Sequence, residues 1–365
     1  MRRLIQVGVG GYGRTWLDTV AQFRDRVEYA ALVDVDPEVL EAARRRFDLA
    51  PRRCVGRLED ALALGEADSL LCVVPPAAHE RVIAPALDAG LHVLSEKPIA
   101  VTVSEADRMI EACRRAGVLL GVMFQQRTEA VYHRAKEIVV SGALGELYRT
   151  TMIANAWYRP QAYYDSGAWR GTWSGEGGGV VMNQAPHSLD MFVWLGGQPS
   201  RVEARAWTRG HRVEVEDTVA ATLEYPNGAT GYLYTTTAEW PGENRVELVG
   251  DRGKLVVLND QARLYRLDKP IREDIDTNAA LFGRPSGGWE DVAVEPAPGG
   301  HAQVVRRFAG AVRRGEPLVA TGEDGLAALE LGNALLLAGY TGRPVDLPLD
   351  RGAYDAFLAE KRAGR

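Results

Sequence analysis

A glycine-rich turn near the start of the chain limits what this protein can fold into. Residues 4–7 (LIQV) form a short apolar run, and Gly8, Gly10 and Gly13 follow it with G-x-G-x-x-G spacing. Residues 14–23 then have the apolar spacing of a helix. A strand, this turn and a helix, in that order, predict a unit that binds the pyrophosphate of a dinucleotide. The free N–H groups at the start of the helix would face the phosphates.

An acidic residue at the end of the next expected strand completes this pattern. Residues 27–33 (VEYAALV) are mostly apolar, and Asp34 follows them twenty-one residues after Gly13. A carboxylate at this position hydrogen-bonds the ribose hydroxyls of adenosine. It would repel a 2′-phosphate, and no arginine follows it directly, so we expect NAD as the cofactor, with NADP less favoured. The alternative is a strand-end aspartate that only caps a turn.

Composition excludes several other classes of protein. With 365 residues the chain is long enough for two domains, and 46% hydrophobic and 25% charged residues are ordinary for a globular protein. The net charge of −6 argues against nucleic acid as a main partner. Cys54, Cys72 and Cys113 lack metal or redox spacing, so we expect reduced, buried thiols and no metal. No apolar run approaches membrane length, and Met1 leads directly into the first strand. We therefore expect a cytoplasmic protein without a signal peptide or a membrane partner.

The pattern of elements changes once along the chain. Strands and helices alternate through residues 1–124, as a parallel α/β sheet requires. We therefore predict the α/β class, with an N-terminal Rossmann dinucleotide-binding domain over 1–124. Residues 125–365 would form a C-terminal α+β domain with a large, mostly antiparallel open sheet.

Turn signals support this interpretation of the second domain. From Arg201 onward, apolar runs flank the turns 225–228 (YPNG) and 250–253 (GDRG), which are typical of hairpins. Residues 272–300 are rich in Gly, Pro and Asp and predict an irregular loop. Two helices are then expected, over about 301–314 and 322–339.

Two expected strands of the first domain end in polar sequences. These are residues 75–79 (PPAAH) and 95–98 (SEKP), and ligands bind open α/β sheets beyond the carboxyl ends of the strands. Lysine is scarce in this chain, so Lys97, held by the proline that follows it, is a candidate for a positioned group. The alternative is a solvated lysine in a turn.

A second candidate cluster lies in residues 177–190 (GGGVVMNQAPHSLD). Asn183, His187 and Asp190 have i, i+4, i+7 spacing, which places them on one face of a helix. Pro186 interrupts that pattern, so either a helix starts near Asn183, a good capping residue, or it bends there. His187 is a candidate acid/base, and a structural histidine is the alternative.

These segments, in this order and over nearly the whole chain, resemble the Gfo/Idh/MocA oxidoreductases, the relatives of glucose–fructose oxidoreductase and inositol dehydrogenase. The resemblance implies a Rossmann domain followed by an α+β domain whose open sheet often forms subunit contacts. We therefore expect a homo-oligomer, a dimer or tetramer, through the C-terminal sheet. It also implies that Lys97 lies beside the nicotinamide and the reacting hydroxyl, and that His187 is the general acid/base.

Further binding residues are expected. Arg127 and the tyrosines are candidates by their place in the sequence, whereas Trp169 and Arg170 resemble the family's Trp-Arg pair near the cofactor. Substrate contacts are expected from Asn183, from Arg127, and from Tyr163 or its neighbour Tyr164. Asn183 departs from the family, because many members have aspartate there, and Ala185 stands where many have glycine. Asparagine can orient a hydroxyl but cannot take its proton, so the work of the base falls to His187 or Lys97. The expected cofactor-binding residues are Gly8, Gly10, Tyr12, Gly13, Asp34, Pro75, His79, Glu96, Lys97, Trp169 and Arg170.

The function expected from these residues is reversible oxidation of a secondary alcohol to a ketone by NAD. The substrate would be a polyol, sugar, cyclitol or sugar derivative. Histidine suits the proton transfer because its reference pKa is about 6.5. One alternative is a glycoside-processing enzyme in which NAD oxidises a sugar hydroxyl only transiently. Another is a dinucleotide-binding regulator without turnover, which would need neither Lys97 nor His187.

Overall fold

The computed structural model describes residues 3–23 and 27–364, which form two compact units. The first unit contains the residues up to Thr128 together with Gly299–Leu329. The second contains Glu129–Pro298 and the residues from Glu330 onward. The chain therefore enters the second unit after Thr128, returns to the first at Gly299 and leaves it again after Leu329.

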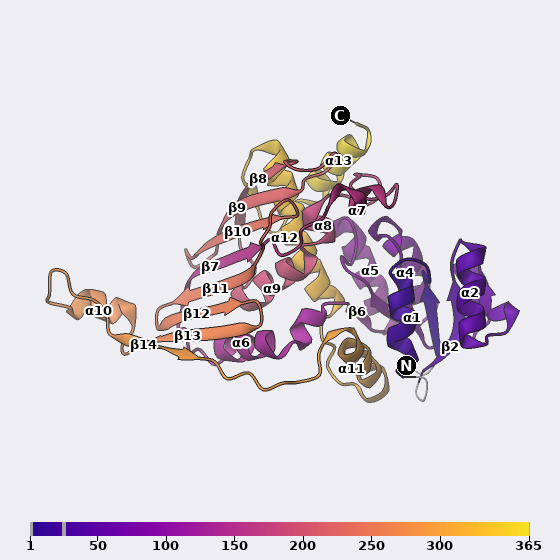
Figure 1. Ribbon diagram of the computed structural model, residues 1–365, viewed down its shortest axis with the longest axis horizontal. Helices are drawn as coiled ribbons and strands as arrows, with labels where there is room; N and C mark the ends of the chain where they lie inside the picture. Colours follow the sequence, from indigo (N-terminus) through magenta and orange to yellow (C-terminus); the bar gives the residue numbers. More distant parts are fainter. Residues whose placement is uncertain (1–2, 24–26, 365) are drawn as a thin grey trace. The chain divides into compact units, whose positions relative to one another are not determined.

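The first unit contains a six-stranded parallel sheet (Figure 1). Its order is β3-β2-β1-β4-β5-β6, so the strand order reverses between β1 and β4, and ligands bind open sheets at such a point. This confirms the predicted Rossmann fold. The strands are β1 (Arg3–Val7), β2 (Glu28–Val33), β3 (Cys54–Val55), β4 (Ser69–Cys72), β5 (His92–Ser95) and β6 (Leu120–Val122). The helices are α1 (Gly13–Ala21), α2 (Pro37–Phe47), α3 (Leu58–Ala63), α4 (His79–Asp88) and α5 (Val103–Ala116), with the short 3-10 turns η1 (Pro51–Arg53), η2 (Pro76–Ala78) and η3 (Gln125–Thr128).

Local sequence signals define several of these elements. All four residues of β4 are buried, as expected for a strand that is covered on both faces. Helix α5 starts with a capping box in which Thr102 and Glu105 each bond the other's backbone, and it ends at Gly117, which has a φ of 66°. Because β4 and β5 pair in parallel, the polar segments that follow them lie at the same edge of the sheet.

Helix α11 (Gly300–Arg314) belongs to the first unit, although the sequence suggested the second domain. Its residues Val304, Val305 and Phe308 are buried in the same apolar cluster as Leu4 and Trp16. The amphipathic pattern predicted a helix with a buried face, but no local signal tells which core buries it. The predicted division at residue 124 thus differs from the structure, in which residues 299–329 pack with the first unit.

The second unit is built on a nine-stranded sheet with the order β14-β13-β12-β11-β7-β10-β9-β8-β15. Among the described strands of this sheet, only β7 and β10 pair in parallel, which confirms the predicted, mostly antiparallel sheet. The strands are β7 (Leu147–Ala154), β8 (Arg201–Trp207), β9 (Thr218–Glu224), β10 (Thr230–Thr236), β11 (Asn244–Gly250), β12 (Gly253–Leu258), β13 (Gln261–Leu267), β14 (Gly287–Asp291) and β15 (Val345–Asp346). The helices are α6 (Ala130–Val140), α7 (Gln161–Asp165), α8 (Val180–Asn183), α9 (Pro186–Gly196), α10 (Ile271–Thr277) and α13 (Arg351–Arg362), with the C-terminal part of α12 (Gly322–Thr341).

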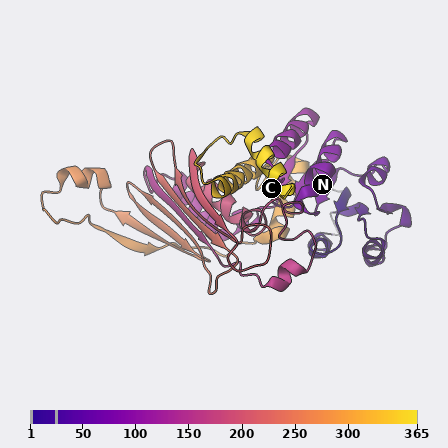
Figure 2. The same cartoon turned by 90° about the horizontal axis from the view of Figure 1, so that it is seen from above.

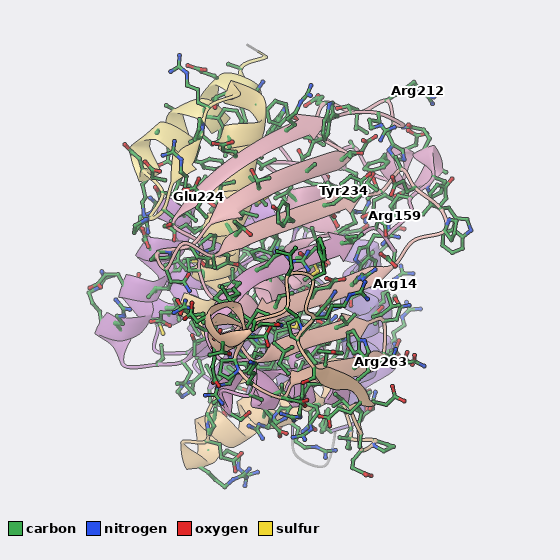
Figure 3. All side chains as sticks on the ribbon, turned by 90° about the vertical axis from the view of Figure 1, so that its left-hand side faces the viewer. Arg14, Arg159, Arg212, Glu224, Tyr234 and Arg263 are labelled. Atoms are coloured by element: carbon green, nitrogen blue, oxygen red, sulfur yellow. The ribbon has the colours of Figure 1, made fainter. Side chains whose placement is uncertain are left out.

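Helices cover one face of this sheet and leave the other open (Figures 1 and 2). Helix α9 packs on β7, and α6 packs on β12 and β13. The alternation along β10 fits this arrangement, because Leu233 is buried while its neighbour Tyr232 is exposed. Figure 3 looks onto the open face, from which Glu224 and Arg263 project.

The hairpin between β9 and β10 forms as predicted. Gly228 has a φ of 81°, and the side-chain oxygen of Asn227 accepts a hydrogen bond from the N–H of Ala229 at 3.1 Å. The prediction of an irregular loop over 272–300 was wrong, because β14 and all of α10 except its first residue lie within it. Every residue of β14 is exposed, so this strand lacks apolar alternation and depends on its pairing with β13.

Two further expectations concern the burial of the cysteines and the lack of a membrane-spanning segment. Cys54, Cys72 and Cys113 are all free, but only Cys72 is buried, because the other two lie at partly exposed positions. Within residues 3–23 and 27–364, no helix is long and apolar enough to cross a membrane. A cytoplasmic location stays a prediction.

Candidate active site

The turn from β1 into α1 can be made only with glycine at two of its positions. Gly8 has a φ of 87°, and a Cβ atom there would lie 2.1 Å from the carbonyl oxygen of Val73. A Cβ atom on Gly13 would lie 2.4 Å from the carbonyl oxygen of Gly8. The buried side chain of Gln6 also donates to the carbonyls of Gly8 and Gly13, at 3.0 and 3.1 Å. The strand and helix therefore meet closely enough for the start of α1 to serve as a phosphate-binding site.

The carboxylate of Asp34 holds this turn from the end of β2. One of its oxygens accepts hydrogen bonds from the N–H groups of Val9 and Gly10 at 2.8 and 3.1 Å. The other accepts from the N–H of Asp36 at 3.0 Å. An ionised carboxylate has about four acceptor positions, so Asp34 keeps capacity for a ribose hydroxyl while it fixes the turn. The turn and Asp34 together fit the adenosine half of a dinucleotide.

Glu96 connects the glycine-rich turn with Lys97. Its carboxylate is buried and accepts from the indole Nε1 of Trp16 at 2.7 Å, and from the backbone N–H of Lys97 at 3.1 Å. Trp16 lies in α1, and the Lys97–Pro98 peptide follows β5 and is cis. Glu96 therefore positions the backbone at Lys97 relative to the helix that begins at the turn.

His79 lies inside the first unit. Its side chain is fully buried, with one ring nitrogen 2.9 Å from the carbonyl oxygen of Val74 and the other 3.2 Å from that of Ile99. Burial lowers the pKa of His79 below its usual value. The imidazole links the segment after β4 to the segment after β5, so any influence of His79 on a cofactor would act through the backbone. Pro75, by contrast, is exposed at the start of the first of these segments.

A histidine that the sequence reasoning missed lies beside Tyr12. The Nε2 atom of His301 is 2.8 Å from the hydroxyl of Tyr12, and its ring meets that of Trp16 edge-to-face at 5.4 Å. Burial lowers the pKa of His301, while burial and the charge on Glu96 raise the pKa of Tyr12 to about 12. His301 lies in the first turn of α11, which the sequence placed in the other domain, so nothing local connected it with the glycine-rich turn.

Arg127 lies in η3, in the interior of the first unit. Its guanidinium pairs with Asp324 at 3.0 Å and lies 3.5 Å from the carbonyl oxygen of Val319. Only 6% of its side chain is exposed. The structure thus gives Arg127 an ion pair within the unit, and its contact with a substrate stays a prediction.

In the second unit, the glycine run 177–179 leads into the segment that carries Asn183 and His187. A Cβ atom on Gly179 would lie 1.8 Å from the carbonyl oxygen of Glu216. The buried carboxylate of Glu216 accepts from the N–H groups of Gly179 and Val181 at 2.8 and 3.1 Å. Desolvation raises the pKa of Glu216 to about 7. This carboxyl group therefore fixes the start of α8.

The expected single helical face is divided between two helices. Asn183 ends α8, and Pro186 opens α9 at its first position, where a proline costs no backbone hydrogen bond. Of the two alternatives, a helix that starts near Asn183 or one that bends there, the first is excluded, because Asn183 ends α8 and His187 lies in the separate helix α9. His187 and Asp190 lie three residues apart in α9, both buried, and share a face of that helix.

Four predicted site residues of the second unit lie together. The Tyr163 hydroxyl donates to the Asn183 side-chain oxygen at 3.3 Å and accepts from the Arg170 guanidinium at 2.7 Å. The guanidinium carbon of Arg170 lies 4.3 Å from the ring centroid of Trp169 and 4.4 Å from that of Tyr163. The neighbouring Tyr164 instead bonds Thr237 and is buried. Of the two tyrosines, Tyr163 is therefore the one joined to this group.

Two further residues of this group were missed from the sequence. Gln184 donates to the Tyr163 hydroxyl at 3.2 Å, and the carboxylate of Glu176 accepts from the amide of Asn183. The only local signal for Glu176 is its charge within the stretch SGEGGG, residues 174–179. A buried partner of Asn183 could not be inferred from that.

The parallel sheet, the glycine-rich turn and Asp34 define an NAD-binding oxidoreductase of the Rossmann class. A family model described as "Oxidoreductase family, NAD-binding Rossmann fold" matches residues 2–124, and one described as "GFO/IDH/MocA C-terminal domain" matches residues 132–256. The chain belongs to the Gfo/Idh/MocA family of oxidoreductases.

Three relatives are similar to this chain over most of its length. The WlbA dehydrogenase from Bordetella pertussis, solved with NADH and UDP-GlcNAcA, is 32% identical, with a TM-score of 0.79 over 96% of this chain and 99% of that one. The WlbA dehydrogenase from Chromobacterium violaceum, with the same two ligands, is 29% identical, with a TM-score of 0.81 over 96% of each chain. A D-apiose dehydrogenase of Paraburkholderia graminis is 26% identical over 93% of this chain and 88% of its own.

The carboxylate of Asp34 leads to a prediction about cofactor choice. NAD should bind at least about tenfold more tightly than NADP, a difference of about 1.4 kcal/mol, because the carboxylate repels a 2′-phosphate. Replacing Asp34 with Ser should lower this ratio of affinities. The loss of the hydrogen bonds to Val9 and Gly10 will also weaken the binding of both cofactors. Titration calorimetry with each cofactor measures the two affinities.

Asp36→Ser provides the matched control for this measurement. Asp36 caps α2 by accepting from the N–H of Glu38 at 2.9 Å, and serine is also a good cap, so the cofactor ratio should not change. Equal affinity of the unmodified protein for NAD and NADP would contradict the assignment of Asp34.

Proposed function

We propose that this protein is an NAD-dependent dehydrogenase that interconverts a secondary alcohol and a ketone on a sugar, a cyclitol or a sugar derivative. The observation that carries the proposal is the link from the glycine-rich turn through Trp16 and Glu96 to the backbone of Lys97. A protein that only binds a dinucleotide has no need of a positioned lysine at the end of β5. Two relatives support the substrate class, since WlbA was solved with UDP-GlcNAcA and another relative is a D-apiose dehydrogenase.

The cofactor would be held by the turn at Gly8–Gly13 and by Asp34. NAD, when bound, supplies the group that accepts the hydride from the carbinol carbon. Pro75 is exposed at the carboxyl edge of the sheet, and Tyr12 is half-exposed beside the turn, so both are available to a ligand there. Trp169 and Arg170 are proposed as further cofactor contacts from the second unit.

Lys97 and His187 would divide the remaining chemistry. As an ammonium group, Lys97 stabilises the negative charge that grows on the substrate oxygen as its proton leaves. An imidazole nitrogen of His187 takes that proton, and it returns the proton when the ketone is reduced. Asn183 has no proton-accepting basic group, so its part is to orient a substrate hydroxyl by hydrogen bonding, together with Tyr163.

A panel of substrates tests the proposal. Inositols, free aldoses and UDP-linked sugars, including a UDP-linked uronic acid, are each incubated with NAD while the absorbance of NADH is followed. Net formation of NADH with at least one substrate supports the dehydrogenase. Substrate turnover without net NADH would indicate transient oxidation, and NAD binding without turnover of any substrate would indicate a regulator.

Replacement of Lys97 should remove most of the rate. We expect Lys97→Ala to lower turnover by two orders of magnitude or more, about 3 kcal/mol, because the developing oxyanion loses its charged partner. Affinity for NAD should largely persist, since Glu96 still accepts from Trp16 and from the backbone at position 97. Steady-state kinetics and NAD titration measure the two effects.

The control for this variant is Lys269→Ala, which removes a lysine that pairs with Asp274 at 3.0 Å. Its turnover should equal that of the unmodified protein. A Lys97→Ala enzyme within a few-fold of normal turnover would show that Lys97 is a turn residue.

The ionisation of His187 should determine how kcat/KM for alcohol oxidation falls at low pH, which is the acid limb of its pH profile. Alcohol oxidation needs the base unprotonated, so kcat/KM should rise with pH through one ionisation of the free enzyme. His187→Gln should lower the rate by about 10²–10⁴-fold, the usual contribution of such a group, and the acid limb should disappear. Initial rates across a pH series measure both.

His133→Gln is the matched control, because His133 is an exposed residue of α6 beside Glu137. It should leave the pH profile unchanged. If the His187→Gln enzyme kept its acid limb and a near-normal rate, His187 would be a structural histidine.

We also propose that the open face of the nine-stranded sheet joins copies of the chain, as a dimer or tetramer. The face carries exposed apolar side chains, among them Tyr232 with 45% of its surface exposed. Its central carboxylate, Glu247, is paired with Arg149 at 3.0 Å, with Lys254 at 2.8 Å and with Arg245, so burial of the face would not leave this carboxylate unpaired.

Sedimentation of a charge variant tests this interface. Tyr232→Glu should weaken self-association by about tenfold or more, because it buries an unpaired carboxylate. Val140→Glu is the control, since Val140 is exposed at the end of α6 on the helix-covered side of the sheet. A monomeric unmodified protein would overturn the proposal.

A further inference from the structure

Glu176 is a buried carboxylate joined to the group of predicted substrate residues. Its side chain is almost inaccessible, with 1% of the residue exposed. One oxygen accepts from the backbone N–H of Gly171 at 2.7 Å, and the other accepts from the side-chain amide of Asn183. Glu176 therefore connects the loop after Arg170 with the last residue of α8.

This contact decides how the amide of Asn183 is oriented. The two ends of an asparagine amide have nearly the same shape, so packing alone cannot choose between them. One Glu176 oxygen is occupied by the N–H of Gly171, and the other accepts from Asn183, so the amide nitrogen of Asn183 is the end that faces Glu176. The oxygen of Asn183 is then left facing the hydroxyl of Tyr163.

The hydrogen bonds of Tyr163 depend on the same orientation of the Asn183 amide. Its hydroxyl accepts from Arg170 at 2.7 Å and from Gln184 at 3.2 Å, and arginine can only donate. The one proton of the hydroxyl is therefore available for Asn183. If the amide of Asn183 alone were reversed, with the amide of Gln184 left as it is, three donors would converge on the hydroxyl, and its proton would lose the Asn183 oxygen as acceptor.

We infer that Glu176 is a positioning residue that fixes the amide orientation of Asn183, and through Tyr163 the position of Arg170, for binding of the substrate. It does not itself meet the substrate, because it is buried behind Asn183. The orientation determines which hydrogen-bonding groups Asn183 offers to a sugar hydroxyl. This inference rests on the proposed function in one respect, namely that Asn183 is a substrate ligand.

Exchange of the two side-chain types tests the inference directly. In Glu176→Gln, the new amide must keep its oxygen toward the N–H of Gly171, so its nitrogen opposes the nitrogen of Asn183. In Asn183→Asp, two carboxylates oppose each other. In the double variant Glu176→Gln/Asn183→Asp, the glutamine nitrogen donates to the aspartate, and every contact is restored with the donor and acceptor exchanged.

We expect kcat/KM to fall in each single variant and to recover in the double variant. With the best substrate of the panel, each single change should lower kcat/KM by about tenfold or more, mainly through KM, because substrate binding is impaired. The double variant should return to within about threefold of the unmodified enzyme, a coupling within the usual range for contacting residues. Glu111→Gln, an exposed glutamate on α5, is the control and should change neither constant.

Thermal unfolding gives a second measurement that does not need activity. The effects of the two substitutions on the melting temperature Tm should not add. The double variant should instead unfold at a higher temperature than either single variant. Effects that simply add, in Tm or in kcat/KM, would overturn the inference. If no substrate of the panel is turned over, the proposed function fails, and the coupling in Tm still decides whether Glu176 orients Asn183.

Discussion

The arrangement of the first unit depends on the hydrogen bonds that the buried carboxylate of Glu96 accepts. It accepts from the indole of Trp16 and from the backbone of Lys97, so the helix that follows the glycine-rich turn and the end of β5 are held by one side chain. A buried carboxylate needs such donors, because burial without hydrogen bonds is costly. The requirement that Glu96 be satisfied therefore fixes the distance between the dinucleotide turn and the lysine.

Acidic side chains play the same part elsewhere in the chain. Asp34 accepts from two N–H groups of the glycine-rich turn, Glu216 from two at the start of α8, and Glu176 from Gly171. In each case a carboxyl group satisfies backbone donors at or near a glycine that have no regular partner in a helix or strand. The acids that give the site its geometry are thus mostly distinct from the groups proposed to carry the chemistry.

The parts of the fold and site that the sequence could predict were those with local signals. The turn at Gly8 and the segment at Lys97 follow strands directly, so their place at the edge of the sheet could be inferred before the structure was known. The contacts of Glu176 and His301 could not, because each depends on which distant segment packs against it. Pro186 shows the intermediate case, in which the sequence indicated an interruption without deciding between a bend and a new helix.

The return of residues 299–329 to the first unit has a consequence for how the chain folds during synthesis. The ribosome completes residues 1–128 early, but the core that surrounds Trp16 still lacks Phe308 and its neighbours in α11. All of residues 129–298 must emerge before those side chains become available. The nucleotide-binding unit, although it comes first in the sequence, is therefore finished only after most of the second unit has been made, and its unfilled apolar surface is exposed to chaperones throughout that interval.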